Sequence, residues 1–226
     1  MTAATWRATP KAALRRLAAT AGPAGVVIGR QHSGALSPVR LLRPQPTRAV
    51  IVGGYWAARL VVFRCLGIGA LVEVTTASPA RWAGLAESAG AAARFRVVPA
   101  GQYVEPWVTP SATLPLIQVN DAGGRGAEKP TLGPWHTSMT ILPAVTAHTA
   151  PVLSDADVVL LQRLSAPEAD VAVTALRLPT DALTKLTQIH DDMMVTIVVG
   201  EPRYIFIVTT PMENDLFGPP RRERDV

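Results

Sequence analysis

Residues 48–66 read Arg-Ala-Val-Ile-Val-Gly-Gly-Tyr-Trp-Ala-Ala-Arg-Leu-Val-Val-Phe-Arg-Cys-Leu, and their pattern indicates the fold class. The apolar, β-branched run before the two glycines predicts a buried central strand. Gly53 and Gly54 permit a tight turn, and the weakly polar residues after them favour a helix that is covered on most sides. Residues 70–75 predict another strand. Because strand, turn, helix and strand form a βαβ unit, we predict the α/β class, with a mostly parallel sheet and flanking helices.

A short β-hairpin is expected directly before this unit. Residues 24–30 and 35–42 have the composition of strands, and the Gln-His-Ser-Gly between them is typical of a turn. Further strands are predicted at 94–99, 114–119, 157–164, 193–199 and 203–210, and helices at 79–93, 166–176 and 180–190. Residues 139–146 fit a strand or a helix equally well. This alternation predicts a single α/β domain over residues 24–216.

The charged residues are distributed unevenly along the chain. It has 226 residues and a formal net charge of +5, and its 48% hydrophobic content excludes an intrinsically disordered protein. Residues 1–72 contain ten basic side chains and no acidic one, whereas residues 73–226 contain 12 basic and 17 acidic ones. One interpretation is an acidic partner for the first third of the chain. The other is mutual neutralisation of the two parts within one fold.

Residues 1–23 are predicted to form a basic arm outside the domain. Within it, residues 10–20 favour a short helix that would be marginal on its own. One aromatic and four basic side chains make this arm a candidate for binding a partner: Trp6, Arg7, Lys11, Arg15 and Arg16. Residues 217–226 are rich in proline and charge, and we expect them to form a disordered tail.

The sequence does not support several other classes of protein. Cys65 is the only cysteine, so no intrachain disulfide can form, and the four histidines lie too far apart for metal-ligand spacing. Arg59 and Arg64 interrupt the most hydrophobic stretch, residues 49–74, which argues against a transmembrane segment. The tryptophans lack the spacing of nucleic-acid-binding modules, so sequence-specific nucleic-acid recognition is not expected. No signal peptide is recognised, and we expect a cytoplasmic protein.

The turn at Gly53 and Gly54 is the place where this sequence would bind an anion, through backbone N–H groups and the dipole of the following helix. The dinucleotide-binding pattern Gly-x-Gly-x-x-Gly fails because Tyr55 stands at the second glycine. The Walker A pattern fails because Arg59 and Leu60 replace its lysine and its serine or threonine. Leu60 cannot bind magnesium. Gly53, Gly54 and Arg59 are therefore candidates for a degenerate anion site, and no cofactor is expected.

The order of elements resembles that of the FtsK/EccC-type motor ATPases. The resemblance rests on Val-Val-Ile-Gly-Arg at 26–30, Pro-Val-Arg-Leu at 38–41 and Arg-Ala-Val-Ile-Val-Gly-Gly at 48–54, which match a hairpin followed by the P-loop strand. Residues 116–121 then correspond to the Walker B strand. Residues 157–163, which end in Leu-Gln-Arg, correspond to a later strand that ends in Thr-Gln-Arg in that family.

This resemblance implies a P-loop NTPase or Rossmann-like fold that has lost hydrolysis. Besides the altered Walker A residues, Asp121 is followed by Ala122 and not by a glutamate that could position water. In type VII secretion motors, P-loop modules with poor catalytic motifs serve as interaction platforms. The chain is thus similar to a non-catalytic type VII secretion-associated scaffold or regulator that binds a protein partner. The sequence does not decide whether the chain also forms a homo-oligomer. The alternative is a Rossmann-like sensor that binds an anionic small molecule or nucleotide at the Gly53-Gly54 turn.

Overall fold

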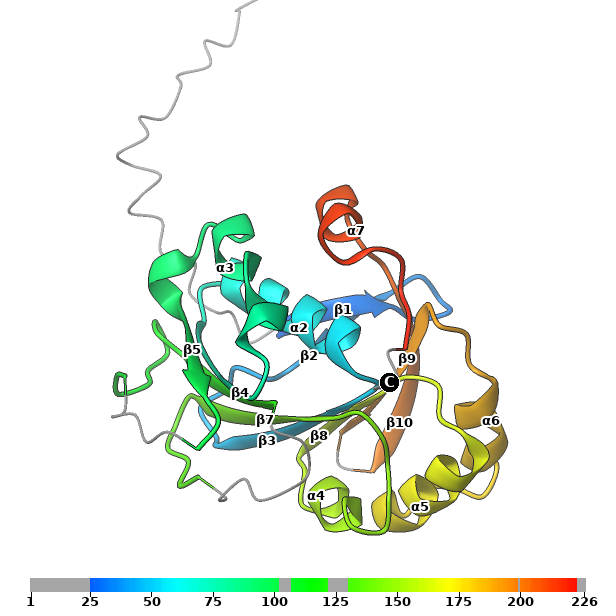
Figure 1. Ribbon diagram of the computed structural model, residues 1–226. Helices are drawn as coiled ribbons and strands as arrows, with labels where there is room; N and C mark the ends of the chain where they lie inside the picture. The colour runs from blue at the N-terminus through cyan, green and yellow to red at the C-terminus, as the bar shows by residue number, and fades with distance from the viewer. Residues whose placement is uncertain (1–24, 102–106, 122–129, 199, 223–226) are drawn as a thin grey trace, which may run out of the picture.

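The computed structural model describes residues 25–101, 107–121, 130–198 and 200–222, which form one mixed sheet with helices on both faces (Figure 1). The ten strands are β1 (Val26–Arg30), β2 (Leu36–Val39), β3 (Thr47–Val52), β4 (Leu71–Thr76), β5 (Phe95–Pro99), β6 (Leu116–Asp121), β7 (His136–Leu142), β8 (Val158–Leu161), β9 (Met193–Val198) and β10 (Glu201–Ile207). Their order in the sheet is β2-β1-β10-β9-β8-β3-β7-β6-β4-β5.

The strands from β8 to β5 in this order run parallel, so the predicted mostly parallel α/β sheet is confirmed. β3 is central, because it pairs with β7 on one side and with β8 on the other. The helix that follows it, α2 (Tyr55–Gly67), leads to β4, but β7 and β6 lie between β3 and β4 in the sheet. The carboxyl ends of β3, β7 and β8 therefore meet beside the turn that starts α2.

The predicted N-terminal hairpin is present, and it belongs to the antiparallel part of the sheet. β1 pairs with β2 and also with β10, so an early hairpin is held by a late strand. Gly29 lies at this junction. A Cβ atom on Gly29 would stand 1.9 Å from the carbonyl oxygen of Phe206, so only glycine allows the two backbones to approach this closely.

The helices form a layer on each face of the sheet, as Figure 1 shows. One face packs α2 and α3 (Leu85–Ser88) against alternate residues of the strands, for example Ala49 and Ile51 of β3. The other face uses the intervening residues Val50 and Val52. It is covered by α4 (Ala150–Ser154), α5 (Ala166–Leu176) and α6 (Ala182–Gln188). The last helix, α7 (Pro211–Phe217), packs beside α2.

Two segments differ from the sequence-based expectation. Residues 79–93 form no continuous helix, because Gly84 and Gly90 have left-handed φ values of 75° and 60° that end one piece before the next begins. The pieces are a 3-10 turn at Pro79–Trp82, then α3, then a 3-10 turn at Ala92–Arg94. Of the ambiguous segment 139–146, residues 139–142 belong to the strand β7, and residues 143–146 lie in the loop that follows it.

The predictions for the two ends of the chain compare differently with the structure. The predicted basic arm, residues 1–23, lies outside the described residues, and so do residues 223–226. The remaining part of the expected disordered tail has defined contacts in the structure, because Phe217 ends α7 in a buried position and the chain then returns to the sheet (Figure 1). Within the described residues, no helix is both long enough and apolar enough to cross a lipid bilayer.

Candidate functional site: the carboxyl end of the central strands

The turn after β3 has the backbone that its two glycines allow. Gly53 and Gly54 have φ values of 138° and 94°, a region that residues with a Cβ rarely adopt. The N–H of Gly53 donates to the carbonyl oxygen of Leu142 at 3.2 Å, which ties the turn to the end of β7. A Cβ atom on Gly53 would lie 2.2 Å from Oε1 of Gln162, so the side chain of Gln162 packs directly against the turn.

Gln162 connects this turn to the segment after α7. The residue follows β8 and is fully buried, and its N–H donates to the carbonyl oxygen of Val52 at 3.0 Å. Its side-chain Nε2 donates to the carbonyl oxygen of Arg221 at 3.1 Å. Trp56, at the start of α2, is 1% exposed, and its Nε1–H donates to the carbonyl oxygen of Gly218 at 3.1 Å. Residues 218–222, hereafter the C-terminal segment, therefore run past the Gly53-Gly54 turn.

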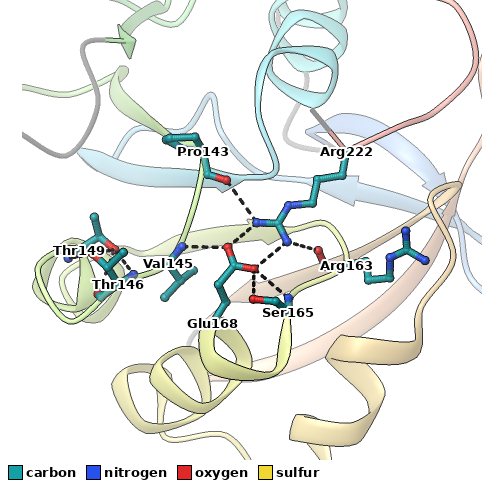
Figure 2. Close-up of polar contacts among 8 residues, drawn as sticks. All are labelled: Pro143, Val145, Thr146, Thr149, Arg163, Ser165, Glu168 and Arg222. Carbon is teal, nitrogen blue, oxygen red and sulfur yellow. Dashed lines mark hydrogen bonds and ion pairs between the residues drawn. The ribbon is translucent and has the colours of Figure 1, made fainter. Parts of the chain in front are cut away.

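The C-terminal segment ends in a buried arginine that has four acceptors around it (Figure 2). Arg222 donates through Nη1 to Oε2 of Glu168 at 2.9 Å and to the carbonyl oxygen of Arg163. It donates through Nη2 to Oε1 of Glu168 and, at 3.2 Å, to the carbonyl oxygen of Pro143. The side chains of Arg222 and Glu168 are only 6% and 11% exposed. We call these acceptors, Glu168 with the carbonyls of Pro143 and Arg163, the arginine site.

The main chain at the start of α5 holds Glu168 in place. Ser165 and Glu168 form a capping box, in which the backbone N–H and the hydroxyl of Ser165 donate to Oε2 of Glu168 at 2.8 and 2.7 Å. The N–H of Val145 donates to Oε1 at 3.2 Å. Burial alone would raise the pKa of Glu168, but the hydrogen bonds from Arg222 and Ser165 outweigh it and lower the pKa to about 2. The carboxylate is therefore ionised at neutral pH.

A second carboxylate at this end of the sheet is also engaged by the chain itself. Asp121 ends β6, and its Oδ2 accepts hydrogen bonds from Thr76 Oγ1 at 2.6 Å and from Trp82 Nε1 at 2.9 Å. Tyr55 also interacts with Asp121. The pKa of Tyr55 is raised, mainly by burial and in addition by the hydrogen bond to this carboxylate. The guanidinium carbon of Arg81 lies 4.1 Å from the centroid of the Tyr55 ring. Asp121 thus belongs to a local polar cluster.

The structure brings together only some of the residues that the sequence singled out. Gly53 and Gly54 form the expected turn between β3 and α2. Arg59 lies further along α2, where its guanidinium carbon is 5.1 Å from the centroid of the Phe217 ring, so it contacts α7. The proposed partner-binding residues of the arm lie outside the described residues. Within the ranges that the structure describes, no three His, Cys, Asp or Glu side chains are grouped so that they could hold a metal ion.

The arginine site is the feature that sequence reasoning missed. The Ser165-x-x-Glu168 spacing is a capping-box signature, and it could have indicated the start of α5. No local signal indicates that Arg222 pairs with Glu168, since 54 residues separate them and the pairing depends on the path of the chain after α7.

Known structures with a similar fold include VirB4, a conjugation coupling protein and a genome packaging NTPase. VirB4 of Thermoanaerobacter pseudethanolicus has a TM-score of 0.58 and 9% identity, over 84% of this chain and 98% of that one. The conjugation coupling protein TcpA of pCW3, with ATPγS, has a TM-score of 0.55 and 9% identity, over 88% of this chain and 69% of that one. The genome packaging NTPase B204 from Sulfolobus turreted icosahedral virus 2, in complex with AMPPCP, has a TM-score of 0.51 and 10% identity, over 73% of this chain and 98% of that one.

These likenesses show that the chain shares its α/β fold with VirB4, with the coupling protein TcpA and with the packaging NTPase B204. They show no more than the fold, because the identities are so low. No protein-family model matches the chain, and no curated protein matches it. Gly53 and Gly54 form the turn between the central strand β3 and the start of α2, a position at which backbone N–H groups and the helix dipole commonly bind an anion.

Proposed function

We propose that this chain is a non-catalytic protein with a P-loop NTPase fold, which acts in the cytoplasm as a scaffold or regulator of a type VII secretion apparatus. One observation supports the proposal that catalysis has been lost. The chain's own residues occupy the end of the sheet where such a fold would hold a nucleotide. Gln162 packs against Gly53, and the C-terminal segment runs past the same turn to Arg222.

The side chains that would organise a magnesium nucleotide also have other roles. Leu60 stands in place of the hydroxyl that binds magnesium, and it is fully buried in the core. Arg59 contacts the ring of Phe217, and Asp121 accepts hydrogen bonds from Thr76 and Trp82. Phosphoryl transfer depends mainly on positioning and on neutralising the phosphate charge with a metal and cations. A site without these groups supports binding roles better than hydrolysis.

The proposed partner class rests on two further arguments. The hairpin and the central strand resemble the FtsK/EccC-type motors, and the similar structures include proteins named for conjugation and genome packaging. The basic arm then supplies a partner-binding segment through Trp6, Arg7, Lys11, Arg15 and Arg16. We propose an acidic surface of a secretion component as its partner.

Calorimetric titration of the full chain with ATP and GTP, with and without magnesium, tests the loss of catalysis, together with a phosphate-release assay. We expect neither binding at millimolar nucleotide nor turnover above background. Magnesium-dependent turnover that disappears in Arg59→Ala would contradict the proposal. Saturable binding of a nucleotide or another anion without magnesium and without turnover would instead support the Rossmann-like sensor. In that case Gly54→Val should abolish the binding.

A further inference from the structure

The arginine site has the geometry of a receptor for a guanidinium group. Both terminal nitrogens of Arg222 donate twice, once to an oxygen of Glu168 and once to a backbone carbonyl. These four acceptors match the planar fork of arginine, and the carboxylate is bound through both of its oxygens. A lysine ammonium is a compact point charge and cannot reach the same four acceptors at once. The site therefore distinguishes arginine from lysine by shape.

The acceptors belong to the body of the domain and not to the C-terminal segment. Pro143 follows β7, Arg163 lies just beyond β8, and Glu168 is in the first turn of α5. Ser165 and Val145 orient the carboxylate through hydrogen bonds that do not involve Arg222 (Figure 2). A receptor whose groups are fixed in advance loses little conformational freedom when it binds.

Two further hydrogen bonds are made to the backbone of the C-terminal segment. Trp56 binds the carbonyl oxygen of Gly218, and Gln162 binds that of Arg221. Many extended peptides could accept these two hydrogen bonds, whereas the contacts of the Arg222 side chain require an arginine. The guanidinium of Arg222 is therefore a sequence-specific part of the interaction, and any arginine in a suitable extended segment could supply it.

We propose that the arginine site is a peptide-binding site of this protein, which holds Arg222 of its own chain and accepts an arginine-bearing extended segment of a partner protein in exchange. Exchange of one arginine for another keeps Glu168 paired throughout, whereas an emptied site would leave a buried carboxylate without a cation. The own segment competes because it is tethered, which gives it a high effective concentration. The proposal deepens the proposed function by naming the chemistry of a partner, and it does not depend on nucleotide.

Fluorescence anisotropy with a labelled synthetic peptide of residues 217–226, Phe-Gly-Pro-Pro-Arg-Arg-Glu-Arg-Asp-Val, tests the proposal on the full chain. We expect Arg222→Ala protein to bind the peptide at least tenfold more tightly than wild type, because its own segment no longer competes. The same peptide with lysine in place of its second arginine should bind at least tenfold more weakly. The double variant Arg222→Ala/Glu168→Gln should lose the binding. Circular dichroism establishes that each variant is folded.

Two results would overturn the proposal: equal affinity for the arginine and lysine peptides, or no binding to a folded Arg222→Ala protein. If Arg222→Ala does not fold, NMR spectra of the isotope-labelled wild-type chain decide between the outcomes. Saturating unlabelled arginine peptide should then shift the amide signals of Arg221 and Arg222 to the positions of a released segment, and the lysine peptide should not. Unshifted signals with the arginine peptide would overturn the proposal. None of these measurements contains nucleotide, so a failure here is distinct from a failure of the proposed loss of catalysis.

Discussion

At the scale of single residues, Glu168 shows how a buried carboxylate becomes a stabilising group. Its pKa of about 2 lies below its ordinary value of 4.5, because Arg222 and Ser165 favour the ionised form more strongly than burial disfavours it. A group with a depressed pKa in the folded state contributes stability above its unfolded pKa, and this contribution is lost as the pH falls toward the folded value. The stability that Glu168 contributes therefore decreases as the pH falls from 4.5 to about 2.

We predict that Glu168→Gln lowers the free energy of unfolding at pH 7 by about 3 kcal/mol, because it leaves the guanidinium of Arg222 without its carboxylate. It should also flatten the decline of stability between pH 4.5 and 2.5. Urea denaturation at several pH values measures both effects. Asp181→Asn is the control, since Asp181 pairs with Lys185 on the surface and its loss should leave the free energy at pH 7 nearly unchanged. An equal acid decline in wild type and Glu168→Gln would contradict the assignment.

Trp56 gives a second prediction at this scale. The ring is 1% exposed, and its N–H is bound to the C-terminal segment, so it stabilises the turn by burial and by one hydrogen bond. We expect Trp56→Ala to cost about 3–5 kcal/mol and Trp56→Phe to cost much less, mainly the hydrogen bond at about 1 kcal/mol. Chemical denaturation followed by circular dichroism measures both. Trp107→Phe is the control, because Trp107 is only half-buried and should change stability by less than 1 kcal/mol.

At the scale of elements, much of the fold could be predicted from sequence. The apolar run that ends at Val52, the glycine pair and the helix after it have local signals, and each was predicted at nearly its observed position. The helix expected at 79–93 was wrong because pattern alone gave too little weight to Gly84 and Gly90. The placement of β7 and β6 between β3 and β4 could not be predicted, since strand order depends on contacts far apart in sequence.

The candidate site was predicted less completely than the fold, for the same physical reason. The Gly53-Gly54 turn has a local signature, so sequence could place it. The neighbours of the turn come from three other parts of the chain: Leu142 at the end of β7, Gln162 after β8 and the backbone of Arg221. Only the folded sheet brings these groups together. The pairing of Arg222 with Glu168 is of the same kind.

The junction of β1 with β10 gives a prediction about an element. Gly29→Ala would place a methyl group 1.9 Å from the carbonyl oxygen of Phe206, so the two strands must separate or shift. We expect a loss of at least about 2 kcal/mol in the free energy of unfolding. Gly67→Ala is the matched control, because a Cβ there meets nothing within 4 Å, and its effect should stay within about 1 kcal/mol. Equal effects of the two substitutions would contradict the close approach of the backbones.

At the scale of the whole molecule, Arg64 joins elements from both ends of the described chain. This residue of α2 donates to the carbonyl oxygens of Val27 and Ile28 in β1 at 2.9 and 2.8 Å, and to that of Val208 after β10 at 2.6 Å. It also forms a two-point ion pair with Glu213 of α7, at 2.7 and 2.8 Å. One guanidinium thus holds the hairpin, the late strand and the last helix against α2.

We predict that Arg64→Met lowers the amide protection of the hairpin and of α7 to a similar degree and leaves that of the central strands nearly unchanged. The substitution keeps an apolar stem but leaves the buried Glu213 without its cation, which should cost about 3–5 kcal/mol. Native-state hydrogen exchange measures the effect element by element: amides of β1 and α7 should exchange faster to a similar degree, while those of β3 change less. Arg64→Lys should recover only part of the protection, because an ammonium cannot reach both Glu213 oxygens and three carbonyls. If α7 alone exchanged faster and β1 kept its protection, Arg64 would stabilise only the position of α7. The pairing of β1 with β10 would then be what holds the hairpin in place.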